Sequence, residues 1–263
     1  MPEKETRTGL YPVFIEAFDL DDAWFKCLYN IFKYGYEYVI DHGSYEGQKR
    51  FEFDFVTVHV KKPHHQILPL MPEGSGLIPP TSMDYIQNYM LYLMTGEKTE
   101  KEDYTYGERL VDFKVRVPRE KNGHRMIEEI PLNINQIDEV IKMYREKGYE
   151  TNQATMEIGM PSDIRLVDPP CCRLIDTRIR YGKLHFIIYF RSWDLYAGFP
   201  ANLGGMELLK QYMADQIGVE NGEMVAISKG MHVYDHCYKY ALARTKQDPS
   251  IMQSAGQKHE EFE

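Results

Sequence analysis

Apolar residues recur along the chain at two spacings, one typical of helices and one typical of strands. Residues 21–34 carry apolar side chains at helical spacing, begin at an aspartate and stop at Gly35, which predicts a helix. Residues 83–94 and 136–147 show the same helical spacing. Residues 51–60 alternate between apolar and polar side chains, which predicts a strand. We therefore expect an α/β protein.

The clearest local pattern is a pair of strand-like runs, residues 172–180 and 184–190, on either side of Tyr181 and Gly182. A tight turn at those two residues would fold the runs into a β-hairpin. Cys171 and Arg191 border the runs, so they would be cross-strand neighbours at the open end of the hairpin. Because a nearby cation favours the thiolate form of cysteine, Cys171 is a candidate nucleophile.

Two further segments follow the hairpin. After Asn202, apolar residues at helical spacing predict a helix that starts beside this asparagine and ends at Gly218. The strand-like run from Met224 then carries His232 and Tyr234, with one residue between them. Both side chains therefore point to the same face and could share one ligand hydroxyl, or could simply form the outer face of an ordinary strand.

Composition limits the classes of function. The chain has 263 residues, 43% of them hydrophobic, and a net charge of −9. Such a chain can bury one substantial core, so we expect a single domain, residues 1–263, with a polar and mobile tail at 247–263. The negative charge argues against a DNA-binding surface, because proteins that bind phosphate backbones concentrate positive charge.

Other features argue against membranes, metals and disulfides. No apolar run approaches a membrane span, and the charged N-terminus is unlike a signal peptide, so we expect a cytoplasmic protein without a membrane partner. The four cysteines lack the spacing of a disulfide framework or a zinc site. His64 and His65 lie in a loop-like stretch without an acidic partner at ligand spacing, so we expect no bound metal.

Several local motifs, taken in order, resemble the thymidylate synthase family, and the whole chain is most similar to its archaeal-type branch. The resemblance is clearest between residues 135 and 234 and poor over residues 1–100, the divergent N-terminal part of the domain. The matching segments are Tyr104 to Arg109, Pro169 to Cys171, the group Arg191, Ser192 and Asp194, the loop from Gly198 to Asn202, and the pair His232 and Tyr234.

The resemblance implies a fold and a reaction. The fold is a large twisted mixed β-sheet backed by helices, with two such sheets stacked in a homodimer. The reaction is the transfer of a one-carbon unit to C5 of a pyrimidine nucleoside monophosphate. Cys171 would add to C6 of the base, and the activated C5 would attack the methylene group of a reduced pterin, 5,10-methylene-tetrahydrofolate or a related tetrahydropterin, with no metal.

The resemblance also implies a role for each matching residue. Covalent addition at Cys171 divides one difficult step into easier ones. Arg191 and Ser192 would bind the 5′-phosphate, with Arg50 as the loop arginine that also binds it. Asn202 would contact the O4 and N3 edge of the base, and His232 and Tyr234 would bind the sugar 3′-hydroxyl. Tyr106 would assist removal of the C5 proton through water, and Asp194 and Gly198 would contact the pterin.

Asn202 gives the most specific information about which base the substrate carries. An amide offers a donor to O4 and an acceptor to the N3 proton of uracil, whereas relatives that act on cytosine nucleotides often have aspartate at this position. Asn202 therefore favours a uridylate. An amide can also turn over and present its other end, so a cytidylate stays open.

The chain departs from the family pattern around the cofactor and the acid–base chemistry. Asn152 and Gln153 stand where the family has two arginines that reach across the dimer. The expected catalytic glutamate is Tyr89, or Asn88 if the alignment slips by one. Phe190 replaces a glutamine, and residues 258–263 lack the family's apolar tail.

Three hypotheses follow. The first is a thymidylate-synthase-type transferase that converts dUMP to dTMP. The second is a 5-hydroxymethylase of the same superfamily, acting on CMP, dCMP or dUMP, in which water captures the exocyclic methylene. The third is a nucleotide-binding or mRNA-binding relative that has lost its chemistry. The sequence does not distinguish ribose from deoxyribose or name the pterin.

Overall fold

A six-stranded mixed sheet forms the centre of the molecule. The computed structural model describes residues 9–100, 102–121 and 124–252. Neighbouring strands pair in the order β1-β4-β11-β9-β8-β7, with both parallel and antiparallel contacts. The bounds are β1 Pro12–Ala17, β4 Phe55–Val60, β7 Thr155–Glu157, β8 Cys172–Arg180, β9 Lys183–Phe190 and β11 Glu220–Ser228. This mixed sheet confirms the expected fold class.

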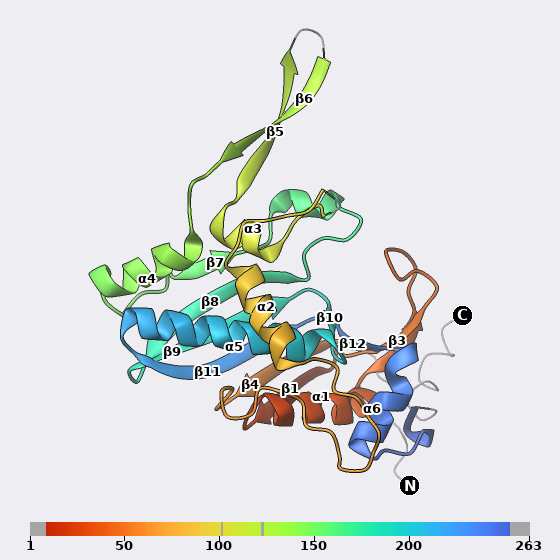
Figure 1. The fold of residues 1–263 in the computed structure, drawn as a ribbon. Coiled ribbons are helices and arrows are strands. Elements are labelled where there is room, and N and C mark those ends of the chain that lie inside the picture. The colour runs from red at the N-terminus through yellow and green to blue at the C-terminus, as the bar shows by residue number, and fades with distance from the viewer. Residues whose placement is uncertain (1–8, 101, 122–123, 253–263) are drawn as a thin grey trace.

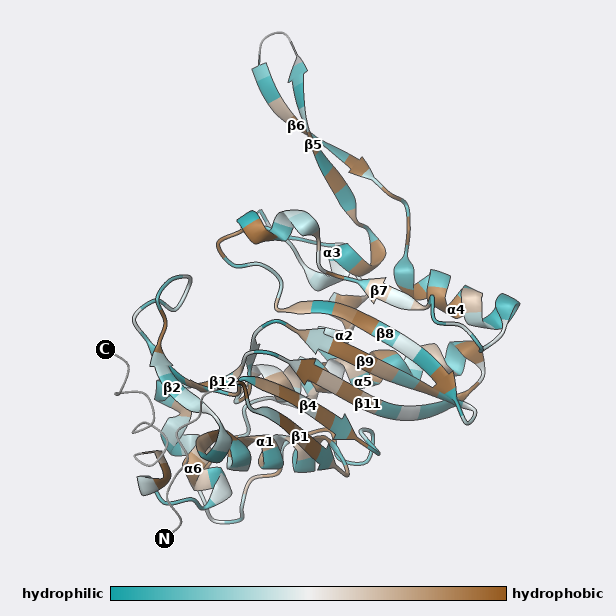
Figure 2. Ribbon diagram, turned by 180° about the vertical axis from the view of Figure 1, so that it is seen from behind, coloured by the Kyte–Doolittle hydropathy of each residue, from teal (hydrophilic) through white to brown (hydrophobic). Residues whose placement is uncertain are grey.

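Helices cover one face of this sheet (Figure 1). The long helix α5 (Gly198–Ile217) and helix α1 (Leu20–Tyr34) bury their apolar sides in the core beneath it. Helix α2 (Met83–Leu93) packs across α5, and α4 (Gln136–Lys147) lies near β7. Figure 2 shows no helix over the opposite face of β4, β11, β9 and β8.

A second, four-stranded sheet extends the core at one end. Its order is β10-β12-β3-β2, with bounds β2 Tyr36–Val39, β3 Lys49–Glu52, β10 Trp193–Asp194 and β12 Met231–Tyr234. The remaining elements are α3 Tyr106–Val111, β5 Lys114–Lys121, β6 His124–Pro131, η1 Pro161–Arg165, η2 Asp235–Cys237 and α6 Tyr238–Thr245. Strands β5 and β6 pair only with each other and project from the body (Figure 1).

The predicted helices at 21–34, 83–94 and 136–147 are all present, to within one residue at each end. Their first residues follow Asp19, Ser82 and Asn135, whose side chains each accept a hydrogen bond from a backbone N–H of the first turn. The predicted hairpin is also present as β8 and β9. Tyr181 and Gly182 both have positive φ, 55° and 71°, as a two-residue hairpin turn requires.

Two predicted strands are each divided in the structure. The run 51–60 breaks at Phe53 and Asp54, which places β3 and β4 in different sheets. The run from Met224 breaks in the same way at Lys229 and Gly230, between β11 and β12. A side chain at Gly230 would come within 3.0 Å of the Arg191 carbonyl oxygen, so the chain turns there on a glycine.

The helix predicted to begin beside Asn202 in fact begins at Gly198, so Asn202 lies inside its second turn. Pro200 does not prevent this, because the first turn of a helix has backbone N–H groups without intrahelical partners. The side chain of Asp194 accepts hydrogen bonds from the backbone nitrogens of Tyr196 and Gly198, at 3.0 Å and 3.2 Å. These contacts fix the turn that leads into α5.

Candidate active site

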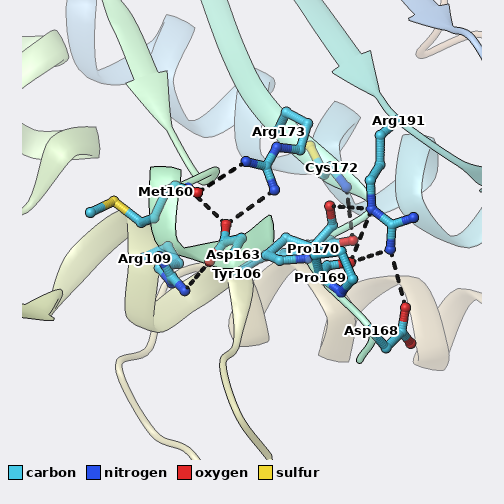
Figure 3. A network of polar contacts seen from close by, with 10 residues as sticks. All are labelled: Tyr106, Arg109, Met160, Asp163, Asp168, Pro169, Pro170, Cys172, Arg173 and Arg191. Carbon is cyan, nitrogen blue, oxygen red and sulfur yellow. Dashed lines mark hydrogen bonds and ion pairs between the residues drawn. The ribbon is translucent and has the colours of Figure 1, made fainter. Parts of the chain in front are cut away.

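The hairpin places Cys171 and Arg191 side by side. The backbone N–H of Arg191 donates to the carbonyl oxygen of Cys171 at 2.8 Å. The guanidinium of Arg191 folds back over the segment before the cysteine (Figure 3). Its Nε donates to the carbonyls of Pro169 and Pro170 at 3.2 Å, and its Nη2 meets Asp168 Oδ1 at 3.1 Å. Arg191 therefore holds the loop that carries the candidate nucleophile.

The Cys171 thiol is partly buried. Burial raises its pKa above the usual value, while the positive charge of Arg191 lowers it. The nearby carboxylate of Asp168 adds to the rise, and Arg50 opposes it. The cation that the sequence predicts beside the thiol is present, but it offsets only part of the effect of burial.

Tyr106 lies directly beside the cysteine pair. Its hydroxyl accepts a hydrogen bond from the backbone N–H of Cys172 at 3.0 Å. Burial raises the pKa of Tyr106 well above its usual value, with the neighbouring groups Tyr89, Cys172 and Cys171 adding to the shift. Tyr106 is therefore a neutral phenol at neutral pH, whose own proton stays available for a further hydrogen bond.

A buried ion-pair network ties the Tyr106 helix to the cysteine strand (Figure 3). Asp163, which is 1% exposed, accepts from Arg109 Nη2 of α3 at 2.9 Å and from Arg173 Nη1 of β8 at 3.0 Å. The backbone N–H of Met160 donates to the same carboxylate at 2.7 Å. Sequence reasoning missed Asp163 and Arg173, because residues so far apart give no local signal.

An aromatic cavity of about 540 Å³ opens next to Tyr106. Such a volume is typical of sites for small organic ligands. Apart from Asn202, Asn88 and Glu102, the wall is made of tyrosines: Tyr85, Tyr89, Tyr92, Tyr104 and Tyr106.

The position expected to hold a catalytic glutamate contributes to this cavity as well. Tyr89 and Asn88, the two candidates for that position, both line the wall. The Tyr89 hydroxyl is buried without a hydrogen-bond partner among the described residues. Burial raises its pKa well above the usual value, and the side chain of Asn202 nearby opposes the rise.

The His232 ring is oriented by the backbone. Its Nδ1 lies 2.8 Å from the carbonyl oxygen of Gly230, and because a carbonyl only accepts, Nδ1 carries the hydrogen. Nε2 is then an acceptor, buried and without a partner in the described part of the chain. Burial lowers the pKa of His232 to about 3, and the charges of Arg50 and Arg191 add to that shift. The ring is neutral and has one free acceptor atom.

Arg50 and Tyr234 complete this side of the site. They are paired residues of neighbouring strands β3 and β12, so Arg50 lies in a strand and not in the loop expected from the sequence. Arg50 Nη2 meets Glu52 at 3.0 Å, and its Nε donates to the Tyr38 hydroxyl at 2.5 Å. The Tyr234 ring contacts His232 edge-on, with 4.7 Å between ring centroids.

Ser192, Asp194 and Gly198 lie between β9 and α5. Ser192 follows Arg191 in the bend before β10, and Asp194 ends β10. Burial raises the pKa of Asp194, while the backbone N–H groups of Tyr196, Gly198 and Ala197 oppose the rise. Phe190, the replacement for a polar residue, is buried and stacked on Trp193. Asn152 lies apart from this group, beside Arg178 and Ile187.

No group of three or more histidine, cysteine, aspartate or glutamate side chains in the described ranges could hold a metal ion. Within those same ranges, no helix has the length and apolar character needed to cross a membrane. Most of the tail predicted to be mobile, residues 253–263, lies outside the described residues.

Comparisons with known proteins agree on one family. The family model described as thymidylate synthase matches residues 88–261. A relative from Methanosarcina acetivorans, named "Putative thymidylate synthase", is 31% identical over 222 residues, which cover 84% of this chain and 89% of the relative. A relative of the same name from Methanosarcina barkeri is 29% identical with the same coverage.

More distant comparisons agree. The thymidylate synthase of Rhizorhabdus wittichii is 30% identical over 143 residues, 53% of this chain and 46% of that protein. Among solved structures, the thermostable thymidylate synthase A from Bacillus subtilis superposes with a TM-score of 0.63 and 17% identity, covering 88% of this chain and 85% of that one. The superposition shows a shared fold. The chain thus belongs to the thymidylate synthase family and is a one-carbon transferase.

Proposed function

We propose that this enzyme converts dUMP to dTMP with a methylene-carrying tetrahydropterin, through a covalent bond between Cys171 and C6 of the base. The observation that carries the proposal is the joint placement of three groups. The backbone of Cys171 bonds to that of Arg191, whose charge lowers the pKa of the thiol, and the Tyr106 hydroxyl contacts the next residue along the chain. Of these three groups Tyr106 lines the aromatic cavity, and the cysteine with its neighbouring cation lies next to it.

The 5′-phosphate and the sugar 3′-hydroxyl of the nucleotide both have suitable partners among these residues. Arg191, Arg50 and Ser192 would hold the 5′-phosphate, for which a guanidinium offers paired donors. A phosphate would compete with Asp168 and Glu52 for these two arginines, which pair with them at 3.1 Å and 3.0 Å. The free Nε2 acceptor of His232 suits a donating sugar 3′-hydroxyl, with Tyr234 beside it.

The first covalent step would be addition of the Cys171 thiolate to the C5–C6 double bond of the base. The Cys171 thiolate forms a bond to C6, the electron pair of the C5–C6 double bond moves toward C5 and the C4 oxygen, and the thiol proton leaves to water. Arg191 favours the thiolate by its charge. When C5 later loses its proton, Tyr106 would pass it to water, and the Cys171–C6 bond breaks as the double bond re-forms.

The aromatic cavity fits the flat ring of a reduced pterin. Its tyrosine faces provide stacking surface, and Asn88 and Glu102 provide polar contacts. Asp194 and Gly198 would bind the pterin from the turn before α5, where the Asp194 carboxylate is already held by backbone N–H groups. When bound, the pterin would supply both the one-carbon unit and the hydride that reduces it to a methyl group, and methylene-tetrahydrofolate is the form we propose.

The proposal includes a homodimer. The uncovered face of the central sheet (Figure 2) carries partly exposed apolar side chains of β9 and β11, among them Ile187, Tyr189 and Val225. At the edge of the same sheet, Phe14 of β1 is 65% exposed. An apolar sheet face of this kind needs a covering layer, which a second copy could supply.

A second candidate function is 5-hydroxymethylation of a pyrimidine nucleotide. The observation that favours it is Tyr89, whose buried neutral hydroxyl replaces the expected carboxylate. A change in acid–base chemistry at this point could let water, rather than hydride, end the reaction.

Product mass separates the two candidates. The purified protein is incubated with methylene-tetrahydrofolate and, in separate reactions, with dUMP, dCMP or CMP. We expect a gain of one methyl group on dUMP alone, and no product from a Cys171→Ser control. A hydroxymethyl gain on any of the three nucleotides would contradict the leading proposal and favour the second candidate.

A further inference from the structure

The amide of Asn202 is held in one orientation by a buried tryptophan. The indole nitrogen of Trp193 lies 3.0 Å from Asn202 Oδ1. Because an indole N–H can only donate, the amide atom that it meets must be the oxygen. This contact removes the usual ambiguity between the oxygen and nitrogen of an asparagine side chain.

Trp193 is itself firmly placed. It is 2% exposed, and its ring stacks on Phe190 with 4.0 Å between centroids and 7° between planes. On another side it packs against Phe199 at 4.7 Å. The indole cannot turn without breaking these contacts, so the orientation of the Asn202 amide is built into the core of the protein.

The amide nitrogen is the end left for a ligand. Asn202 lines the aromatic cavity together with Tyr89 and Tyr106, and the interaction of its side chain with the Tyr89 phenol opposes the rise in the pKa of that group, which directs the Nδ2 end toward the cavity wall. The oxygen end faces Trp193 and the start of α5, where a side chain at Gly198 would lie 3.6 Å from Oδ1. The cavity therefore meets hydrogen-bond donors of the amide.

The order of atoms around a pyrimidine relates this orientation to the base. With C6 at Cys171 and C5 beside Tyr106, the next atom around the ring is C4 with its exocyclic group. On the cavity side, away from Trp193, the amide presents N–H donors, which fit the C4 oxygen of uracil. The C4 amino group of cytosine would face those donors with hydrogens of its own, which is unfavourable.

We propose that Trp193 is a specificity-determining positioning residue, which fixes the Asn202 amide so that the site accepts uracil and rejects cytosine. The inference rests on the proposed function, because it uses the placement of the base on Cys171. Trp193 touches no substrate in this account and acts only through Asn202.

The test compares the affinities of the protein for dUMP and dCMP in a Trp193→Phe variant. Phenylalanine keeps a stacking ring but has no N–H, so the amide becomes free to turn over. We expect the wild type to prefer dUMP and the ratio of the two dissociation constants to fall about five- to tenfold in the variant, on the scale of one net hydrogen bond. Isothermal titration calorimetry measures both constants directly.

The other tryptophan of the chain provides a matched control. Trp24 is also fully buried, and its indole nitrogen donates at 2.9 Å, but to the backbone carbonyl of Leu195. Trp24→Phe should therefore lower stability and leave the dUMP to dCMP ratio unchanged. A loss of packing alone would affect stability in both variants but would not change the ratio in either.

A second variant tests the same inference if Trp193→Phe does not fold. In Asn202→Asp, one oxygen can keep the Trp193 bond while the other replaces the amide nitrogen, so the preference should shift from dUMP to dCMP. A wild type that prefers dCMP, or a ratio unchanged in the folded variants, would overturn the inference and leave the pyrimidine chemistry standing. A wild type that binds neither nucleotide would overturn the proposed function as well.

Discussion

The thiol of Cys171, the proposed nucleophile, is subject to opposing influences on its pKa. Burial raises the pKa of Cys171, Arg191 lowers it, and Asp168 raises it. The thiolate fraction therefore increases with pH and is small near neutrality in the free enzyme. A bound phosphate that displaced Asp168 from Arg191 would change this balance, so in the proposed reaction one arginine would couple substrate binding to activation of the nucleophile.

Two substitutions should move the Cys171 pKa in opposite directions. Arg191→Ala removes the cation that stabilises the thiolate, so the midpoint of alkylation by iodoacetamide should move to higher pH. Asp168→Asn removes a negative charge, so the midpoint should move to lower pH. The pH profile is followed at Cys171 by fragmentation of the labelled peptide. Equal midpoints in both variants and the wild type would contradict this electrostatic account.

At the scale of elements, the site depends on a close crossing of α2 and α5. Gly204 and Gly205 of α5 lie against Ile86 and Tyr89 of α2, and a methyl group on Gly205 would lie 2.4 Å from a ring carbon of Tyr89. This approach sets the position of Tyr89 over the cavity. Glycine is thus required at the crossing, although it is a poor residue for a helix interior.

Gly205→Ala gives a clear test of this crossing. Helix propensity alone predicts that alanine stabilises the protein by about 1 kcal/mol, whereas overpacking predicts a loss of about 1–3 kcal/mol. We expect the loss, measured by urea unfolding. Gly9→Ala is the control, because a methyl group there meets nothing within 4 Å. Stabilisation in Gly205→Ala would show that the helices can separate at no cost.

The sequence predicts elements whose signals are local. The helix at 136–147 has its capping side chain, Asn135, and its stop, Gly148, beside it, and the β8–β9 hairpin has its turn residues in place. The divided strands were missed because the breaks serve a change of sheet, which depends on distant partners. The contact of Trp193 with Asn202 and the Arg109–Asp163–Arg173 network also arise only when the chain is folded.

The candidate site also combines features that have a local sequence signal with features that form only when the chain folds. The hairpin pattern predicts Cys171 beside Arg191, and the backbone hydrogen bond between these two residues agrees with it. The resemblance implies a role for Tyr106 in the same reaction, and its hydroxyl contacts the backbone N–H of Cys172. Periodicity could not show that the helix begins before Asn202, because Pro200 and Gly198 weaken the pattern at its start. The roles assigned to these residues remain proposals for experiment.

At the scale of the whole molecule, the uncovered sheet face is the most consequential surface. Within the described residues, the helices that pack on the central sheet lie on its other side (Figures 1 and 2). The projecting β5–β6 hairpin does not cover it either. The proposed homodimer would place a second layer over β9 and β11.

Sedimentation tests the homodimer. The wild type should sediment at twice the mass of one 30.9 kDa chain. Ile187→Arg places a charge in the middle of the open face and should shift the protein toward monomer, because burying an unpaired charge is costly. Ile78→Arg, at a loop position that is 83% exposed, should leave the dimer intact. A monomeric wild type would contradict the proposal.

The release of tritium from C5-labelled dUMP, in the presence of methylene-tetrahydrofolate, shows whether Cys171 attacks C6 of the base. Label leaves C5 only after the base has been activated at C6, so release reports the covalent step itself. We predict release by the wild type, a loss of at least about a thousandfold in Cys171→Ser, and retained release in Cys172→Ala, which alters the adjacent buried thiol. Release by Cys171→Ser at the wild-type rate would contradict the assignment of Cys171 as the nucleophile.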